Sequence, residues 1–417
     1  MVFSEKQKFL AFILILVLAV ILRSAYFFVF RPPLNWDYGV TFHLAAKNIL
    51  SGKGYSLDGI KPYTAREPGY SLFFLAPFYA VFGPHIFAAL ILNLLLTLLI
   101  ICFVFWFGKN YFSTETGLWA GFFLALYPPL IAFGGELLAD LPFAFLVVCS
   151  VFILIQAVEK KSKKRIFAAG VFFGAATLTK SSATFLPFFL LPFLYLSLSK
   201  NWKETIRAVI LLYSGFLLTV VPYFAANYLT FGRFFYLRDD GGLNLWAGSY
   251  LPWDGEFRGN NAYPLPDLVK GLDVWEADAK LAKLAFENIK KNSLGVLLIW
   301  LKKPARLLFK PEFNSVLQRE NSFAHLTAKG KLNPVLIRAV LLAINVLLVG
   351  LAALGAFVSL QKNRRMAILI LSIIVYFLLI LLPFSPDARY KLPLLPFLAV
   401  LASLGLSFLK NLIMRRF

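Results

Sequence analysis

The feature that most constrains this 417-residue chain is a series of long apolar runs, the first of which extends from Phe9 to Phe30. A helix needs about 20 residues to cross the roughly 30 Å hydrocarbon core of a bilayer. Hydrophobic residues make up 59% of the chain and charged residues only 15%, whereas about a quarter of an ordinary globular domain is charged. The sequence therefore excludes a soluble single-core protein and predicts an all-α, polytopic membrane protein.

Hydropathy predicts about ten membrane spans. We place them at 9–30, 85–107, 117–133, 137–157, 166–181, 183–199, 206–228, 334–360, 366–384 and 391–409. Two further apolar stretches, 70–82 and 294–309, reach only about 20–24 Å as helices. Counting both as spans would put the basic cluster 160–165 on the outer side, so we expect them to be amphipathic helices in the outer interface.

The basic residues indicate how the chain is oriented. Lys and Arg gather in the short loops 160–165, 200–207 and 362–365 and near both termini, and ten spans put all of these on one side. Positive loops stay in the cytoplasm, so we expect a multi-pass protein of the cell (inner) membrane with cytoplasmic termini. These loops explain much of the formal net charge of +21, and nucleic acid is not predicted as a partner.

The outer side then holds two substantial regions, 31–84 and 229–333, each with one interfacial helix. No repeat or linker divides the chain, so we expect 1–417 to form one membrane domain whose active site lies on the non-cytoplasmic side. The second region carries Trp246, Tyr250 and Trp253 among several acids. Such aromatic residues suit sugar stacking, or they form an interfacial belt.

Asp37 is the first candidate for chemistry, because it lies a few residues beyond the first span. A carboxylate under an apolar roof keeps a raised proton affinity and can act as a general base. Alternatively, Asp37 is a solvated acid that caps a helix beginning near Tyr38. In the same loop, Arg66 and Glu67 could orient a phosphate or an acceptor, or could pair with neighbours.

Short motifs occur in a fixed order along most of the chain and together carry a resemblance. They are Asp37, Leu44 to Tyr55, Arg66 to Tyr70, Glu136 to Phe143, Gly174 to Lys180, Pro222 to Gly232, Gly242 to Gly248 and Arg389 to Pro393. This order resembles the GT-C membrane glycosyltransferases, of the protein O-mannosyltransferase and aminoarabinose transferase type. The chain departs from the family at Tyr38, where Glu is frequent, and at Ala226, where Arg is frequent.

The resemblance implies transfer of a sugar from a polyprenyl-phosphate carrier to a lipid, glycan or protein acceptor, with inversion. A lipid phosphate is already a good leaving group, so one base suffices, and cations stabilise the departing phosphate. We assign Asp37 as the base and Lys180 and Arg389 as the phosphate-binding cations. Lys180 could instead snorkel from a helix end, and Arg389 could simply pair with Asp387.

The same motifs supply further candidates. Tyr390, Asn227, Tyr228 and Asn244 are expected in substrate binding, although Asn227 and Tyr228 could only cap their span. Glu136 and Asp140 lie four residues apart, so a helix beginning after Gly135 would put them on one face. They could bind the acceptor or, with Asp37, a divalent cation, or Glu136 could only favour a helix N-terminus.

No paired-histidine spacing is present, so a tightly held zinc is not expected, and metal dependence stays open. A flippase or transporter of a lipid-linked sugar is the alternative function, because it too needs an apolar groove and cations. Transporters tend to have paired halves, and this chain has no internal symmetry of that kind. Loss of transfer in an Asp37→Asn variant would distinguish the two.

Overall fold

The computed structural model describes residues 4–30, 37–232, 237–311, 333–385 and 387–414, except the side chains of residues 30, 37, 38, 334 and 388. Within these ranges the chain is helical and contains no strand, and one isolated antiparallel bridge joins Ser56 and Pro62. The predicted all-α class is therefore confirmed.

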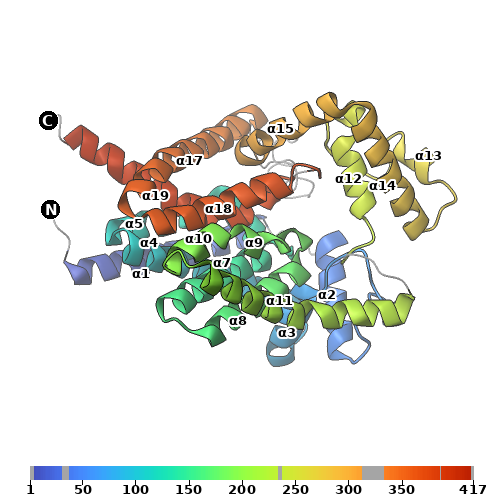
Figure 1. The fold of residues 1–417 in the computed structure, drawn as a ribbon, viewed down its shortest axis with the longest axis horizontal. Coiled ribbons are helices and arrows are strands. Elements are labelled where there is room, and N and C mark those ends of the chain that lie inside the picture. Colours follow the sequence, from blue (N-terminus) through green and yellow to red (C-terminus); the bar gives the residue numbers. More distant parts are fainter. Residues whose placement is uncertain (1–3, 31–36, 233–236, 312–332, 386, 415–417) are drawn as a thin grey trace.

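Six long apolar helices dominate the fold (Figure 1). They are α1 (Glu5–Phe30), α4 (Ile86–Tyr111), α7 (Asp140–Glu159), α11 (Trp202–Phe231), α17 (Pro334–Lys362) and α19 (Leu395–Met414), the last preceded by the 3-10 helix η4 (Ala388–Leu394). Each is long and apolar enough to cross a bilayer. They coincide with the predicted spans at 9–30, 85–107, 137–157, 206–228, 334–360 and 391–409. Two shorter helices, α8 (Lys163–Thr179) and α18 (Arg364–Ile380), coincide with the spans at 166–181 and 366–384.

The remaining two predicted spans are not straight helices. The span at 117–133 consists of α5 (Thr114–Leu126) and α6 (Pro128–Gly134), which meet at an angle of 60°. The span at 183–199 is divided into η2 (Ser181–Ala183), α9 (Leu186–Phe189) and α10 (Leu191–Ser197). Pro187 and Pro192 each lie in the first turn of a piece, where the missing N–H costs nothing. The total of ten crossings stays a prediction.

Arg23 stabilises the bend between α5 and α6. Its guanidinium, on α1, donates to the carbonyl oxygens of Leu124 and Ala125 at the end of α5, each at 3.2 Å. Pro128 has no N–H to continue the helix, so these carbonyls need another donor. Arg23 is only 6% exposed, and the negative end of the helix dipole favours a cation there.

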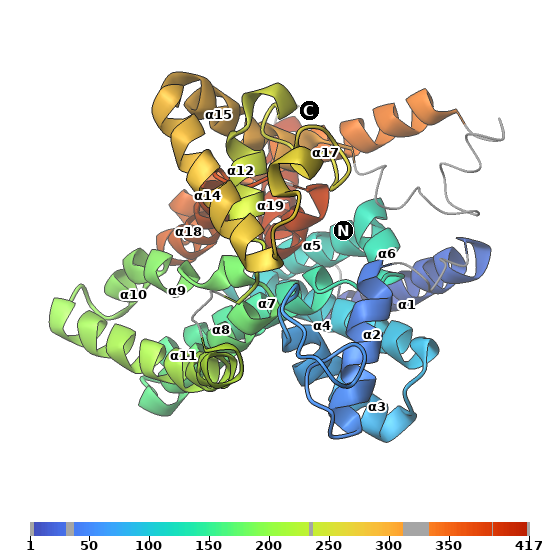
Figure 2. The ribbon, with the colours of Figure 1, turned by 90° about the vertical axis from the view of Figure 1, so that its right-hand side faces the viewer.

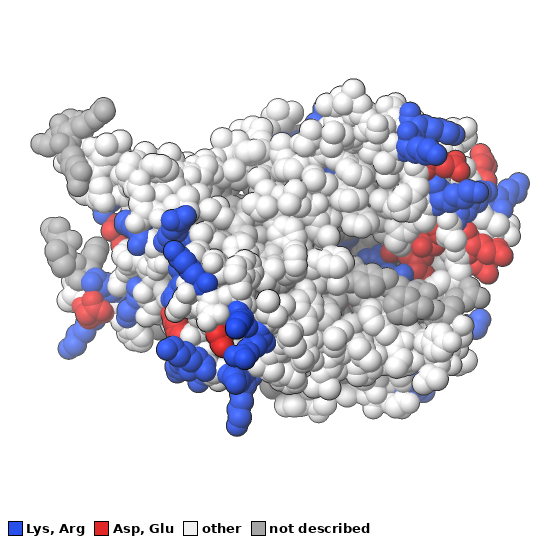
Figure 3. Space-filling model, in the orientation of Figure 1, with Lys and Arg blue, Asp and Glu red and all other residues white. Residues whose placement is uncertain are grey.

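The surface of the long helices is that of a membrane protein. Leu10, Leu14 and Ile21 on α1 are 57%, 58% and 56% exposed, which a soluble protein would avoid in so long an array. Lys and Arg lie toward both ends of the molecule, with Asp and Glu among them, and a wide band between the two ends is almost free of charge (Figure 3). The chain is therefore a multi-pass membrane protein.

The segments that separate the long helices in the sequence form two smaller structures. The first comprises α2 (Asp37–Leu50), the π-helical turn η1 (Tyr70–Leu75) and α3 (Ala76–Phe82). The second comprises α12 (Gly241–Ser249), η3 (Leu251–Trp253), α13 (Leu265–Val269), α14 (Val274–Lys291) and α15 (Ser293–Phe309). We name it the outer lobe, and region 31–84 the first outer loop, after the side of the membrane predicted for them. The lobe stands apart at one end of the molecule, and α2 and α3 lie below it in the rotated view (Figure 2).

The outer lobe has a hydrophobic core of its own. Trp246 stacks on Tyr250 with ring centroids 4.7 Å apart, and Trp253 packs edge-on against both rings. Trp246 and Trp253 are only 2% and 3% exposed. These two tryptophans therefore form neither a sugar-stacking surface nor an interfacial belt, because the lobe uses them to build its interior.

A single buried lysine joins the lobe to the membrane helices. Lys303 on α15 is 1% exposed, and its ammonium donates to the carbonyl oxygens of Gly248, Leu382 and Phe384 at 2.8–2.9 Å. Gly248 belongs to α12, whereas the other two residues lie between α18 and η4. Three acceptors match the three protons of an ammonium group, so this contact orients the lobe against the segment that leads to Arg389.

Candidate functional site

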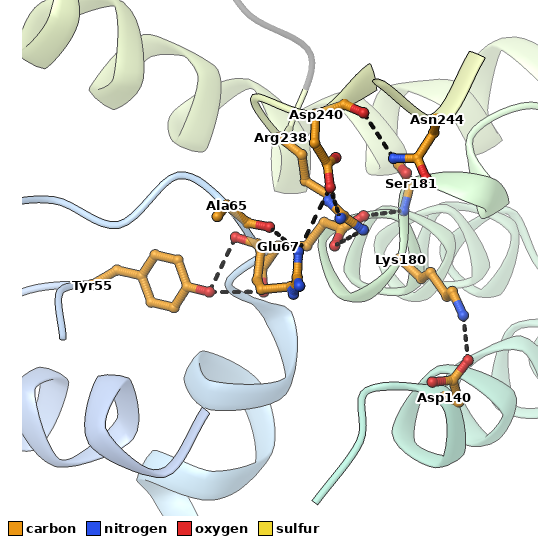
Figure 4. Close-up of polar contacts among 10 residues, drawn as sticks. Tyr55, Ala65, Glu67, Asp140, Lys180, Ser181, Arg238, Asp240 and Asn244 are labelled. Atoms are coloured by element: carbon orange, nitrogen blue, oxygen red, sulfur yellow. Dashed lines mark hydrogen bonds and ion pairs between the residues drawn. The ribbon is translucent and has the colours of Figure 1, made fainter. Parts of the chain in front are cut away.

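An open pocket lies where the first outer loop, the ends of α7 and α8, and η4 meet. It is lined by Phe42, Arg66, Glu67, Leu138, Ala139, Asp140, Thr179, Lys180, Arg238, Arg389 and Tyr390. Six residues proposed from the sequence, which come from four separate motifs, are thus brought together. Figure 4 shows how several of them point toward one another. The pocket is rich in charge although it adjoins apolar helices, which favours a role in binding or chemistry.

Lys180 points into this pocket rather than away from it. Helix α8 ends at Thr179, and the extended backbone of Lys180 (φ −157°) directs its side chain across to α7. There the ammonium pairs with the carboxylate of Asp140, and it lies 3.8 Å from the centroid of the Tyr390 ring. The side chains of Lys180 and Asp140 are 16% and 6% exposed. The alternative of a lysine snorkelling into solvent is therefore not what the structure shows.

Glu67 fixes the first outer loop to the turn that carries Lys180. One carboxylate oxygen accepts the backbone N–H of Ser181 at 3.0 Å, and the other lies 3.7 Å from the guanidinium of Arg238. Burial of Glu67, 4% exposed, is thus offset by two partners. The hydroxyl of Tyr55 lies 3.1 Å from the carbonyl oxygens of both Arg66 and Glu67 and orders their backbone.

Gly69 allows the loop to approach so closely. A Cβ atom at this position would lie 2.6 Å from the backbone nitrogen of Thr179, a distance that real Cβ contacts do not reach. The loop backbone therefore packs directly on the end of α8. This contact sets the distance between Glu67 and the turn at Lys180.

Arg238 is the pocket residue that sequence reasoning missed. It follows Leu237, a fully buried residue in the left-handed region (φ +60°), where backbone strain marks many functional sites. Its guanidinium pairs with the carboxylates of Glu67 and Asp240. Burial alone would lower the pKa of Arg238, but these two carboxylates raise it above its ordinary value. The only signal in the sequence was the charged run Arg238 to Asp240 beyond a span.

Two acids that follow Arg238 tie the outer lobe to the first outer loop. Asp240 lies 3.6 Å from Arg66, and the Asp239 carboxylate accepts the hydroxyl of Thr64 at 2.5 Å. Asn244 donates to the backbone oxygen of Asp240 at 2.7 Å and does not line the pocket. Asn244 thus stabilises the backbone at Asp240 without lining the pocket.

Asp37 begins α2, and its side chain lies outside the described part of the structure. The helix itself is placed beside the pocket. A Cβ on Gly39 would lie 3.5 Å from the side chain of Leu137, and Phe42 lines the pocket. The N-terminal turn of α2 therefore adjoins the segment that leads to Asp140. The role of Asp37 as the base stays a prediction.

Glu136 and Asp140 do not share a helix face, because α7 begins at Asp140 and residues 136–139 form a turn. The prediction of a helix beginning after Gly135 was wrong. The amide of Asn93 fixes this turn by donating to the carbonyl oxygen of Glu136 at 2.7 Å, and Asn93 accepts the hydroxyl of Tyr70. Glu136 is buried but does not line the pocket.

Asn227 and Tyr228 lie on the last turns of α11 and do not line the pocket either. Tyr228 is 57% exposed.

Among the described side chains, no group of three or more His, Cys, Asp or Glu could hold a metal ion. Asp140 pairs with Lys180, Glu136 does not line the pocket, and the Asp37 side chain lies outside the described part. A divalent cation held by these three acids therefore stays a prediction, and no step proposed below involves one.

The chain is similar to known proteins in sequence and in fold. Residues 66–227 match the model of the family described as dolichyl-phosphate-mannose-protein mannosyltransferase. The archaeal oligosaccharyltransferase AglB from Archaeoglobus fulgidus, solved with an inhibitory peptide and a dolichol-phosphate, has a TM-score of 0.56 at 16% identity. That match covers 99% of this chain and 52% of AglB. No curated protein sequence matches the chain.

Two further structures are similar. The oligosaccharyltransferase of Archaeoglobus fulgidus in the apo form has a TM-score of 0.56 at 12% identity, over 99% of this chain and 52% of that one. ArnT from Cupriavidus metallidurans bound to undecaprenyl phosphate has a TM-score of 0.48 at 15% identity, over 94% and 77%.

The chain therefore has the fold of the GT-C membrane glycosyltransferases, and the resemblance predicted from its motifs is confirmed. It spans about half the length of the oligosaccharyltransferase chains that it matches. The family model covers the part of the chain that begins at Arg66 and ends at Asn227, and this part includes both members of the Asp140–Lys180 pair.

Proposed function

We propose that the protein transfers a sugar from a polyprenyl-phosphate carrier to a hydroxyl of a lipid, glycan or protein acceptor at the outer face of the membrane. One observation carries this proposal. Four cations, Arg66, Lys180, Arg238 and Arg389, line a single pocket at the ends of apolar helices. Among the described residues, two carboxylates, Glu67 and Asp140, line the same pocket, and this excess of positive charge favours an anionic ligand. A phosphate with a long apolar tail supplies both the charge and the hydrocarbon.

The cations divide into two kinds. Arg66 and Arg238 are engaged with Glu67 and Asp240, which anchor the outer loops. Lys180 pairs with Asp140, and Arg389 lies 3.5 Å from Asp387, the partner considered for it above. The charged groups of Lys180 and Arg389 lie 3.8 Å and 5.6 Å from the centroid of the Tyr390 ring. We assign these two to the donor phosphate, because both line the pocket beside one aromatic ring, and a guanidinium and an ammonium can contact different phosphate oxygens.

The proposed reaction needs one base. The acceptor oxygen attacks the anomeric carbon, the bond from that carbon to the phosphate oxygen breaks, and the carrier leaves as a polyprenyl phosphate. The hydroxyl proton passes to the carboxylate of Asp37. Attack opposite the leaving group inverts the anomeric carbon. The cations stabilise the charge that develops on the phosphate, so the leaving group needs no acid.

The membrane placement is part of the proposal. The basic loops near both termini support a cytoplasmic location of that end, which puts the pocket on the outer side. Helix α15 exposes Leu294, Leu297, Leu298 and Leu301 along one face, by 48–67%. A stripe at this spacing supports the prediction that α15 lies in the outer interface.

The test is transfer by the purified protein. The full chain is incubated with labelled polyprenyl-phosphate sugars and a membrane extract, and the labelled product is identified. The Asp37→Asn variant should bind the carrier and lose transfer by at least about 100-fold, the usual contribution of a general base. Arg258→Met, which removes an exposed arginine of the outer lobe, serves as control. If the wild type consumes none of the donors, the proposal fails.

The alternative function gives a different result in the same variant. A flippase has no acceptor to deprotonate, so Asp37→Asn would leave movement of a lipid-linked sugar across vesicles unchanged. Flipping that persists in this variant, together with an absence of transfer by the wild type, would favour the flippase.

A further inference from the structure

The pocket already contains an anion at the position where the donor phosphate would bind. The ammonium of Lys180 has the Tyr390 ring on one side and the Asp140 carboxylate as its ion-pair partner. Both Asp140 and Lys180 line the cavity. A phosphate that contacts Lys180 must therefore compete with a carboxylate of the protein itself.

The two carboxylates that line the pocket are held very differently. Glu67 accepts a backbone N–H from Ser181 and pairs with Arg238, so it has two partners. Among the described residues, the partner of the Asp140 side chain is Lys180. Asp140 is also the first residue of α7, where the helix dipole favours a negative charge without a specific partner. Without Lys180 the buried Asp140 carboxylate would keep only the helix dipole, so it favours taking Lys180 back once a competing anion leaves.

We infer that Asp140 is a built-in competitor that gives up Lys180 to the donor phosphate and takes it back when the carrier leaves. This inference rests on the proposed function. It makes Asp140 a residue that determines specificity and turnover rather than a catalytic residue. In the empty pocket it neutralises a cation that would otherwise be buried and unpaired, which is costly.

The charge of the two carriers explains why a competitor is useful. A polyprenyl-phosphate sugar is a phosphodiester with one negative charge. The polyprenyl phosphate that remains after transfer is a monoester, which carries about −1.5 to −2 near pH 7. Four cations would therefore hold the product more tightly than the donor. A carboxylate beside them repels the product more than the donor, and so promotes release.

The test compares binding of the two carriers to Asp140→Asn and to the wild type. The amide keeps the shape of the side chain and removes its charge. Undecaprenyl phosphate should inhibit the variant at about tenfold lower concentration, the effect expected from removing one charge a few ångströms away. The KM for the donor should fall by less than about threefold, because the donor carries less negative charge than the product. The value of kcat should fall because product release is slower.

A matched control is available on the same outer side. Asp254 pairs with Arg306 outside the pocket, and its left-handed backbone (φ +53°) accommodates asparagine. Asp254→Asn should leave inhibition by undecaprenyl phosphate within about twofold of wild type, because exposed pairs contribute little. Asp140→Glu, which keeps the charge, should restore inhibition toward the wild-type value.

Two outcomes would overturn the inference. If Asp140→Asn folds, as judged by thermal unfolding, and binds undecaprenyl phosphate no more tightly than wild type, then Asp140 positions Lys180 instead of competing with the phosphate. If Asp140→Asn gains equal affinity for the donor and for the product, the Asp140 charge does not discriminate between them. Direct binding of undecaprenyl phosphate to the full chain can be measured without turnover. If the wild type binds undecaprenyl phosphate but transfers no sugar, the proposed function fails. The binding measurement on Asp140→Asn then still decides whether Asp140 competes with the phosphate.

Discussion

The hydroxyl of Thr64 donates a hydrogen bond of 2.5 Å to the carboxylate of Asp239, across 175 positions of the sequence. Asp239 is only 8% exposed, and Arg238 beside it pairs with Glu67. The bond thus fastens the outer lobe to the first outer loop at the rim of the pocket. It positions Arg238 although neither member of the bond touches the cavity.

Removing this bond should loosen the pocket. Thr64→Val leaves the buried carboxylate of Asp239 without its donor, which costs about 1–3 kcal/mol. We expect a lower melting temperature and a several-fold rise in the KM for the donor, with a smaller change in kcat. Thr230→Val, an exposed threonine that bonds within its own helix, is the control. A melting temperature equal to wild type would contradict this prediction.

Gly69 should not tolerate a side chain. Gly69→Ala puts a methyl group 2.6 Å from the backbone nitrogen of Thr179, so the loop must move away from the turn at Lys180. We expect transfer to fall by at least about tenfold, since displacement of about 1 Å can cost more than that. The matched control is Gly350→Ala on α17, where a Cβ meets nothing within 4 Å and alanine should be neutral or stabilising. Equal activity of the two variants would show that the close approach is unimportant.

Arg23 should be needed for stability rather than for chemistry. Arg23→Met removes the donors to Leu124 and Ala125 and should destabilise the protein by about 2–3 kcal/mol, at roughly 1 kcal/mol or more for each bond to a charged group. Arg207→Met, at a position where the side chain is 71% exposed, should change stability by less than about 0.5 kcal/mol. Unfolding of both variants in the same detergent measures the difference.

Acidification should weaken the packing of α2 through His43. Its ring nitrogen lies 2.9 Å from the hydroxyl of Tyr79, and burial, with a smaller effect of Lys47, lowers the pKa of His43. The unfolded chain therefore binds a proton at a higher pH than the folded one, so stability falls as the pH drops below about 6.5. The melting temperature of wild type should fall more between pH 7.5 and 5.5 than that of His43→Gln. An identical fall would exclude His43 as the cause.

The sequence predicted helices better than their interruptions. Long apolar runs specify spans because hydrocarbon leaves the backbone no other partner. The division of the span at 183–199 into short helices was not predicted, because this run is uniformly apolar. Hydropathy does not show that Pro187 and Pro192 lack a backbone N–H. The start of α7 was placed too early, since the turn at Glu136 is fixed by Asn93 on another helix, a contact that local pattern does not contain.

The site was predicted in parts but not as a whole. The order of the motifs identified Lys180 and Asp140 separately. Their pairing depends on the start of α7 lying beside the end of α8. Arg238 carries no motif, and its place in the pocket follows from contacts with Glu67 and Asp240. Asn227 and Tyr228 belong to a family-like segment, but neither of them lines the cavity.

The contact made by Lys303 has a consequence for variation and for protein engineering. All three of its acceptors are main-chain oxygens, so the identity of the side chains at Leu382 and Phe384 does not alter the bonds. A chimera in which a different outer lobe is grafted onto these helices therefore keeps these three bonds if it has an amine at the equivalent helical position, whatever side chains the recipient carries at 382 and 384.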